Sequence, residues 1–391
     1  MPEVSRKVGR FSESMIRQMT ILSNRYNAEN LAQGFPEFDP PEELIKSLEK
    51  AAQYGPHQYA PSWGAENFRE AVAVKQSRSL NKKINPDNEV LVTCGSTEAM
   101  ISVMFALFNP GDKVIIFSPY YTSYVSDSIL AGVDPVFVSL KGSEFNFDKD
   151  ELEEAFKKKP KAIIICNPCN PCGKVFTKDE LLTIAELAKK YDTFVITDEV
   201  YEHIIYEPYK QIYFASLPDM FERTISCSSL SKTYSITGWR LGYVVASKNI
   251  IEEVRKIHDF LTVCAPSPLQ KAAITGLQFN EEYYENLKNI YTKKRDLFLK
   301  GLDELGFIHN IPQGTYFVLV NIDEFNYKSD VAFCEMLVKN YKIAAVPGSA
   351  FFYDGNRSWI RLHFAKNDET LKEVINRLRR LRSDFSLKSR L

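Results

Sequence analysis

The 391-residue chain lacks the features that mark membrane, secreted and nucleic-acid-binding proteins. It contains no run of about 18 uninterrupted apolar residues, so no membrane-spanning helix is expected. Its polar start, Met1 to Lys7, has no apolar segment or cleavage site of a secretory signal, which predicts a cytoplasmic location. The chain has 49 Lys and Arg and 50 Asp and Glu, so its net charge is -1, and no global electrostatic field favours binding of nucleic acid or an anionic membrane. Any anionic ligand must therefore be held by local groups.

Cysteine is also scarce, and its distribution argues against a disulfide framework. Seven cysteines, an odd number, are spread over the chain, in agreement with a reducing compartment. Internal repeats, low-complexity tracts and flexible linkers are missing as well. The length predicts two or three domains, and 45% hydrophobic with 25% charged residues is typical of a globular protein with a sizeable core.

The middle of the chain alternates short β-rich apolar runs with amphipathic helical stretches, which indicates an α/β fold. Several runs are apolar throughout, as expected for parallel strands covered by helices on both faces. A helix should begin at the capping box formed by Thr177 and Glu180. Seven strands are predicted, at residues 89–93, 113–117, 135–140, 161–166, 193–197, 224–228 and 241–247.

The last third of the chain has a different pattern and predicts a smaller α/β domain. A long charged helix over 281–306 is followed by strands at 316–320, 343–346 and 359–364 and by helices near 329–340 and 368–382. We therefore expect three parts: an N-terminal arm (1–40) that packs with the small domain, a large domain (41–280) and the small C-terminal domain (281–391).

Four segments place polar groups after predicted strands, at the edge where open α/β sheets bind ligands. In the first, Ser96 and Thr97 open a helix after Gly95, where backbone N–H groups and hydroxyls can hold a phosphate. The bland alternative is an ordinary helix cap. In the second, two Asn-Pro pairs stiffen a loop, Asn167 to Gly173, that can aim the Asn170 amide at a ligand.

The same loop carries Cys166, Cys169 and Cys172 at a C-x2-C-x2-C spacing, which also occurs in iron–sulfur and zinc sites. No fourth cysteine or histidine follows at a useful spacing. The prolines between the cysteines suit a rigid turn better than a metal, so we favour reduced thiols.

The third and fourth segments supply a carboxylate and an amine. Asp198 ends a buried strand, where a carboxylate is costly unless it is paired; it either caps local structure or partners a protonated ring nitrogen. Lys232 lies among hydroxyl residues, with Arg240 eight residues later. A nearby cation and partial burial lower a lysine's pKa, which suits Lys232 as a Schiff-base nucleophile toward an aldehyde.

Together these motifs resemble the class I/II pyridoxal-phosphate-dependent aminotransferases of fold type I, over residues 25 to 380. Within that family the chain is most similar to the branch of kynurenine, glutamine, aspartate and methionine aminotransferases. The resemblance implies a large domain with a mostly parallel seven-stranded sheet between helices, plus a smaller α/β domain. It rests on Ser229-x-Ser231-Lys232 with Arg240, Asn170-Pro171-x-Gly173, Asp198-x-x-Tyr201 and Trp359-Ile360-Arg361-Leu362.

The resemblance also implies the residues that hold pyridoxal 5′-phosphate. Lys232 would carry the cofactor as an aldimine, and Asp198 would pair with its pyridine nitrogen. Asn170 and Tyr201 would hydrogen-bond the ring hydroxyl, and Tyr121, in a Pro-x-Tyr-x-x-Tyr segment, would stack on the ring. The phosphate would be held by Ser96, Thr97, Ser229 and Arg240.

Further implied contacts involve the substrate and a second subunit. Arg361 would clamp the substrate α-carboxylate, because its planar fork donates two parallel hydrogen bonds. The backbone of Gly34 would approach the substrate. Tyr59 would reach the phosphate of the neighbouring subunit, which implies a homodimer with shared active sites.

The function expected is therefore ping-pong transamination between an L-amino acid and a 2-oxo acid. One alternative is cysteine-conjugate β-lyase activity or another reaction of the same cofactor. A second is a non-catalytic regulator, although the segment before Gly34 is too short to hold the winged helix of such proteins. A third is a metal or redox protein.

Substrate choice is open at this stage. We expect neutral-to-aromatic donors with 2-oxoglutarate as acceptor, and a pocket lined by Phe35, Tyr59, Tyr121, Phe351 and Phe352, although Phe351 and Phe352 also suit a domain core. A dicarboxylate would need a second cation, from Arg10, Arg17 or Arg25, which the sequence does not place.

Overall fold

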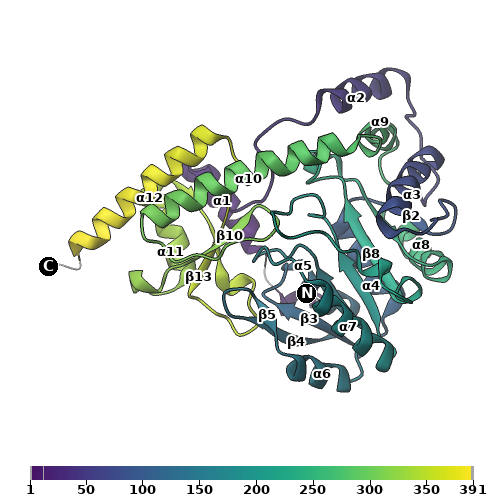
Figure 1. Cartoon of the computed structure of the whole chain (residues 1–391), viewed down its shortest axis with the longest axis horizontal. Coiled ribbons are helices and arrows are strands. Elements are labelled where there is room, and N and C mark those ends of the chain that lie inside the picture. Colours follow the sequence, from purple (N-terminus) through teal and green to yellow (C-terminus); the bar gives the residue numbers. More distant parts are fainter. Residues whose placement is uncertain (1, 12, 389–391) are drawn as a thin grey trace.

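The computed structural model describes residues 2–11 and 13–388 and contains one large sheet (Figure 1). All seven strands predicted for it are present, and the two-residue β5 adds an eighth. Strands β8, β7, β6, β3 and β4 run parallel, whereas β9 is antiparallel to β8 and β2, and β5 is antiparallel to β4. In spatial order the strands are β2 (Val90–Thr93), β9 (Gly242–Val245), β8 (Thr224–Ser229), β7 (Phe194–Asp198), β6 (Ala162–Cys166), β3 (Lys113–Ser118), β4 (Asp134–Lys141) and β5 (Asn146–Phe147).

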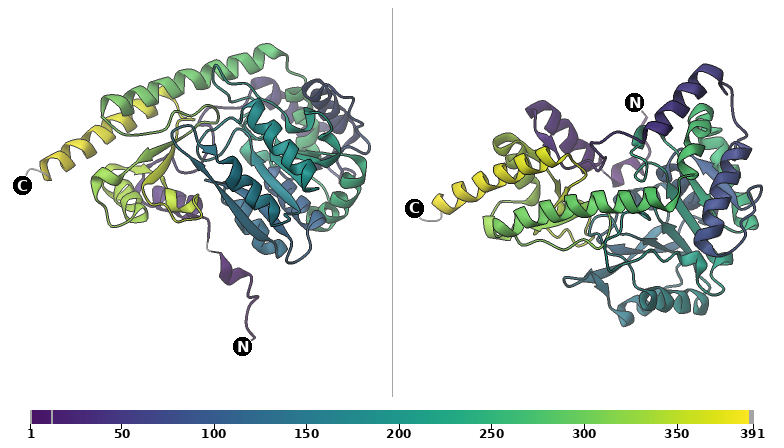
Figure 2. Two further views of the ribbon diagram at one scale, coloured as in Figure 1. Left: turned by 60° about the horizontal axis from the view of Figure 1, so that its bottom comes forward. Right: turned by 45° about the horizontal axis from the view of Figure 1, so that its top comes forward.

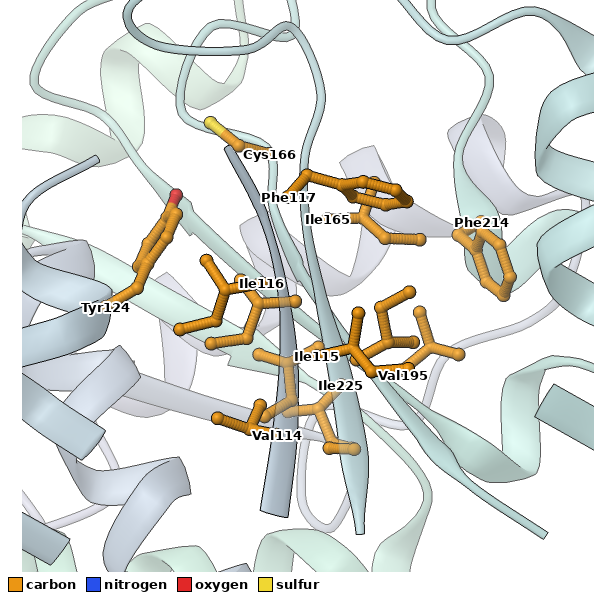
Figure 3. Close-up of a cluster of buried hydrophobic side chains, with 14 of the residues drawn as sticks. Val114, Ile115, Ile116, Phe117, Tyr124, Ile165, Cys166, Val195, Phe214 and Ile225 are labelled. Carbon is orange, nitrogen blue, oxygen red and sulfur yellow. The ribbon is translucent and has the colours of Figure 1, made fainter. Parts of the chain in front are cut away.

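Helices bury both faces of this sheet, as its continuous apolar runs predicted. On β2, Leu91 belongs to one hydrophobic cluster, whereas Val90 and Val92 belong to another on the opposite face. The first cluster continues through the central strands, where Ile115 and Ile116 lie among buried side chains (Figure 3). The covering helices are α2 (Glu42–Tyr54), α3 (Glu66–Leu80), α4 (Ser96–Leu107), α5 (Ser123–Ala131), α6 (Lys149–Lys157), α7 (Lys178–Lys190), α8 (Lys248–Thr262) and α9 (Ser267–Leu277).

Helix α7 begins where the sequence predicted. The Thr177 hydroxyl accepts a hydrogen bond from the Glu180 backbone N–H (3.2 Å), and the Glu180 carboxylate accepts one from the Thr177 N–H (2.8 Å). This confirms the predicted capping box.

The C-terminal third forms a three-stranded antiparallel sheet of β10 (Phe317–Asn321), β13 (Trp359–His363) and β12 (Val346–Pro347). The strand predicted at 343–346 is divided: β11 (Ile343–Ala344) pairs with β1 (Glu29–Asn30), and β12 joins β13. The helix predicted at 329–340 consists of α11 and a π-helical turn. The helices are α10 (Glu281–Glu304), α11 (Asp330–Met336), the π turn (Leu337–Tyr341) and α12 (Asp368–Lys388).

The N-terminal helix α1 (Met15–Tyr26) packs on this smaller sheet. It contacts β11, β12 and the π turn, and Met19 and Ser23 are its buried residues. Residues 2–11, before α1, run away from the smaller sheet (Figure 2), and Lys7 Nζ donates a hydrogen bond to the carbonyl of Leu130, in α5 (2.8 Å). No helix among the described residues is long and apolar enough to cross a membrane.

Candidate active site

One cavity of about 760 Å³ lies at the carboxyl ends of the central strands, bordered by α1 and by the smaller sheet. The parallel β6, β7 and β8 all end at this edge, so the loops after them converge although they are distant in sequence. Tyr59, which the sequence predicted for a neighbouring subunit, does not line it and is 83% exposed. The other predicted residues all do: Gly34, Ser96, Thr97, Tyr121, Asn170, Asp198, Tyr201, Ser229, Lys232, Arg240 and Arg361.

The amine of Lys232 is held in this cavity just after β8. Its Nζ donates a hydrogen bond to the Gly34 carbonyl at 2.7 Å. Burial lowers the pKa of Lys232 to about 8, and the charges of Arg240 and Arg361 add to this, against the opposing effect of Asp198. Near neutral pH the amine therefore reaches its reactive, unprotonated form far more readily than an ordinary lysine.

The carboxylate of Asp198, the last residue of β7, has a protein partner that the sequence analysis missed. The Tyr124 hydroxyl donates to Oδ2 at 2.6 Å, and the Val200 backbone N–H donates to Oδ1 at 3.3 Å. Burial raises the pKa of Asp198, while these hydrogen bonds and Lys232 oppose that rise. Tyr124 is the second tyrosine of the Pro-x-Tyr-x-x-Tyr segment, and that pattern was the available signal.

The start of α4 and Arg240 form a cradle suited to an anion. Arg240 has a left-handed backbone (φ 57°), and its guanidinium donates to the carbonyls of Thr237 (3.0 Å) and Cys94 (3.2 Å). A Cβ on Gly95, at φ 81°, would collide with that guanidinium, so only glycine permits this approach. Ser229 Oγ lies 2.8 Å from Ser231 Oγ. A helix N-terminus, hydroxyls and a fixed cation are the groups that bind phosphate.

A second cation, Arg361 on β13, is 1% exposed and has no carboxylate partner within residues 2–11 and 13–388. It donates to the Asn170 side-chain oxygen and to the Ala32 carbonyl, both at 2.7 Å, and its Nε has no hydrogen-bond partner. Burial lowers the pKa of Arg361 to about 10. A buried cation with only neutral partners is costly unless an anion completes it, so Arg361 is suited to bind a carboxylate.

Glycine at position 34 is required by close packing. A Cβ there would lie 2.5 Å from the Phe317 ring. The Gly34 carbonyl accepts from Lys232 and from the Tyr316 hydroxyl (2.9 Å), so the loop is tied both to the large domain's amine and to the smaller sheet.

Two tyrosines complete the wall. The Tyr201 ring meets Tyr316 edge-on, with centroids 5.3 Å apart, and the Tyr121 ring meets Tyr124 edge-on at 5.8 Å. Burial raises the pKa of Tyr201 well above its ordinary value, so its hydroxyl stays protonated and is able to donate.

The aromatic pocket expected from the sequence forms only in part. Phe35 and Tyr121 line the cavity, whereas Phe351 is fully buried and packs in the core of the smaller domain, as the alternative interpretation had it. Its ring lies beneath the Arg361 guanidinium, 4.7 Å from Cζ to the ring centroid. Phe352 is partly buried against the core and lies outside the cavity lining.

The three closely spaced cysteines are buried free thiols. Cys166 Sγ accepts a hydrogen bond from the Asn170 backbone N–H at 3.4 Å, and Cys169 Sγ faces the Pro119 carbonyl at 3.8 Å. Over the described part of the chain, no three His, Cys, Asp or Glu residues are grouped so that they could hold a metal ion. The loop instead brings Asn170 onto Arg361.

Comparison with known proteins agrees with this geometry. The sequence model of the family "Aminotransferase class I and II" matches residues 27–378. The chain is 35% identical to the methionine aminotransferase of Escherichia coli over 96% of its own length and 97% of that protein's. It is also 35% identical to the aspartate aminotransferase of Pyrococcus abyssi, over 94% and 95%.

A solved structure gives the same result. That of N-succinyldiaminopimelate aminotransferase from Mycobacterium tuberculosis superimposes with a TM-score of 0.93 at 34% identity, covering 97% of this chain and all of the other. The chain therefore belongs to the class I and II aminotransferase family and is a transaminase with that family's fold.

Proposed function

We propose that this aminotransferase uses pyridoxal 5′-phosphate to move the amino group of an L-amino acid to a 2-oxo acid in a ping-pong reaction. The observation that carries the proposal is the convergence of the Lys232 amine, the Asp198 carboxylate and the cations Arg240 and Arg361 on one cavity. These groups differ in charge and in position, and each matches one part of the cofactor or the substrate.

The donor set fits the cofactor. Ser96, Thr97, Ser229 and Arg240 would hold the phosphate in the cradle at the start of α4. Asp198, fixed by Tyr124, would pair with the pyridine nitrogen. When bound, the cofactor supplies an electron-withdrawing ring that stabilises charge developing at the substrate Cα. The remaining ring contacts are assigned to Asn170 and Tyr201 at the hydroxyl and to Tyr121 on the ring face.

Two residues act on the substrate. Lys232, once its amine is free, takes a proton from the substrate Cα and delivers it within the same site, for which a lowered pKa is suited. Arg361 binds the substrate α-carboxylate through its fork, since its own protein partners are neutral. The Gly34 carbonyl, which accepts a hydrogen bond from Nζ, holds the Lys232 amine in the cavity.

The proposal also covers the assembly, the domain division and the cellular location of the protein. Tyr59 is exposed and outside its own chain's cavity, which supports a role at the phosphate of a second subunit in a homodimer. We retain the division into an arm (1–40), a large domain (41–280) and a small domain (281–391), and we retain the cytoplasm as the expected location.

Product identity tests this proposal. The protein, loaded with pyridoxal 5′-phosphate, is incubated with an amino donor and 2-oxoglutarate. Formation of the donor's oxo acid with equal glutamate supports transamination. Pyruvate and ammonia from a cysteine conjugate, without amino transfer, would establish β-elimination in its place.

A further inference from the structure

We propose that Arg17, on α1, is a specificity residue that binds the distal carboxylate of a dicarboxylic substrate. This inference rests on the proposed function and names its substrate class: acidic amino acids and the corresponding five- or four-carbon 2-oxo diacids. Of the three arginines that the sequence left unplaced, Arg17 lines the cavity, whereas Arg10 and Arg25 do not.

The other charged groups of the cavity account for the cofactor and the substrate α-carboxylate, so neither of these anions needs Arg17. Among the described residues that line the cavity, the carboxylate of Asp198 is the sole acid, and it is already hydrogen-bonded to Tyr124. The cofactor phosphate is assigned to Arg240 and the α-carboxylate to Arg361. A substrate with a second carboxylate supplies the one anion that would balance Arg17.

Arg17 is also free to make that contact. Within residues 2–11 and 13–388 its guanidinium has no hydrogen bond and no ion pair, and Glu13, four residues earlier, forms none with it. An exposed arginine that faces a cavity and has no protein partner loses little when a carboxylate binds it in the forked geometry.

The fold holds Arg17 and Arg361 on one unit. Helix α1 is anchored by its buried residues Met19 and Ser23 to the smaller sheet, where it contacts β11 and β12. Arg361 lies on β13, directly paired with Val346 of β12. Because 3.6 residues form a helical turn, Arg17 points away from the Met19 face and toward the cavity. The two cations are therefore placed relative to each other by packing and not by a mobile side chain alone.

The wall beside Arg17 suits a short methylene chain that ends in a carboxylate. Ile16, Ile21 and Phe35 provide apolar surface, and Ser14 and Gln33 provide neutral polar groups. The Gln33 side-chain oxygen is taken by the Thr20 hydroxyl at 3.1 Å, while its amide nitrogen has no partner in the described chain and is left to donate.

A matched substrate pair tests the inference. 2-Oxoglutarate and 2-oxopentanoate share five carbons and differ by the distal carboxylate. In the loaded enzyme, Arg17→Gln should lower kcat/KM for 2-oxoglutarate about 10- to 100-fold, mainly through KM, and change that for 2-oxopentanoate by less than about threefold. Arg17→Lys should lie between, and Arg25→Gln, on the same helix but outside the cavity, should match the wild type.

A binding measurement separates this inference from the proposed function. Calorimetric titration with glutarate and with pentanoate reports the distal carboxylate without any turnover, and Arg17→Gln should weaken glutarate alone. If Arg17→Gln lowered the affinity or kcat/KM equally for the dicarboxylate and the monocarboxylate of a pair, or for neither, the role of Arg17 would be overturned. A wild-type enzyme that transfers no amino group but still binds glutarate through Arg17 would contradict the proposed function instead.

Discussion

Two clusters of charged residues, one that includes Asp198 and one around Glu202, are built in opposite ways. Asp198, Lys232 and Arg361 face the cavity, and the two cations have neutral protein partners. Four residues after Asp198, Glu202 lies in a closed cluster: Lys75 Nζ is 2.7 Å from one carboxylate oxygen, and the Tyr213 hydroxyl donates to the other at 2.7 Å.

The pKa shifts follow from that difference. Burial alone would raise the pKa of Glu202, but the Lys75 ammonium, His203 and the hydrogen bonds lower it to about 2. In the cavity, burial and two like charges lower the pKa of Lys232 to about 8. A charge with a full set of protein partners stays ionised inside the fold and is costly to leave unpaired, whereas a charge without them is available to a ligand.

We call Asp198, Lys232 and Arg361, which face the cavity, the open cluster. The largest expected effect is the loss of Lys232 from this cluster. Lys232→Ala should reduce transamination at least about 10⁴-fold, over about 5 kcal/mol, and remove the visible absorption of the bound cofactor. Its melting temperature should not fall, because in the described part of the chain the buried amine bonds only a neutral carbonyl and forms no ion pair. Retained absorption and turnover would show that another residue carries the cofactor.

Breaking the closed cluster should have the reverse signature. Lys75→Met leaves Glu202 buried without its cation and should lower the free energy of unfolding by about 3–5 kcal/mol, measured by chemical denaturation. Lys75→Met with Glu202→Leu should recover most of that loss, since no charge is left uncompensated. If the single variant loses cofactor binding at unchanged stability, the two clusters are not separate.

The closed cluster also predicts a pH dependence of stability. The pKa of Glu202 is about 2 in the folded protein against 4.5 when exposed, so its contribution of about 3 kcal/mol is present above pH 4.5 and is lost as the pH falls toward 2. His203, whose pKa burial lowers from 6.5 to about 3, acts in the same direction over pH 6.5 to 3. When chemical denaturation is measured at a series of falling pH values, the free energy of unfolding should decrease less for the Lys75→Met, Glu202→Leu variant than for the wild type. An equal decrease for both proteins would contradict this.

Tyr124 offers the smallest and most specific change in the open cluster. Tyr124→Phe removes the hydroxyl that donates to Asp198 and should weaken cofactor affinity by about tenfold or less. The control is Tyr120→Phe, because the Tyr120 ring stacks on Phe137 and the hydroxyl that bonds Asp198 is that of Tyr124. Equal affinities for the two variants would remove Tyr124 from the site.

Sequence pattern was sufficient for the elements and much of the cavity lining. Each of the seven runs predicted for the large sheet became a strand. Those that are apolar throughout, such as β6 (Ala162–Cys166), are stable there because helices cover both sides of the sheet. The two-residue β5 is too short to give a pattern. The segment at 343–346 was assigned to one strand but serves two sheets, since its first half pairs with β1, which lies far away in sequence, and its end pairs with β13.

Contacts between distant residues account for what the sequence left open. Tyr124 and Asp198 are 74 residues apart, and Lys75 and Glu202 are 127 apart, so neither pairing is visible in local spacing. Arg10, Arg17 and Arg25 look alike in the sequence, and only the packing of α1 on the smaller sheet distinguishes Arg17.

The most direct test of the account is to locate the cofactor on the chain. The purified protein is incubated with pyridoxal 5′-phosphate, reduced with borohydride and digested, and the peptides are analysed by mass spectrometry. The account predicts one pyridoxyl-phosphate group, on Lys232, and its disappearance when an amino acid is added before reduction. A label on another lysine, or none on Lys232, would contradict it.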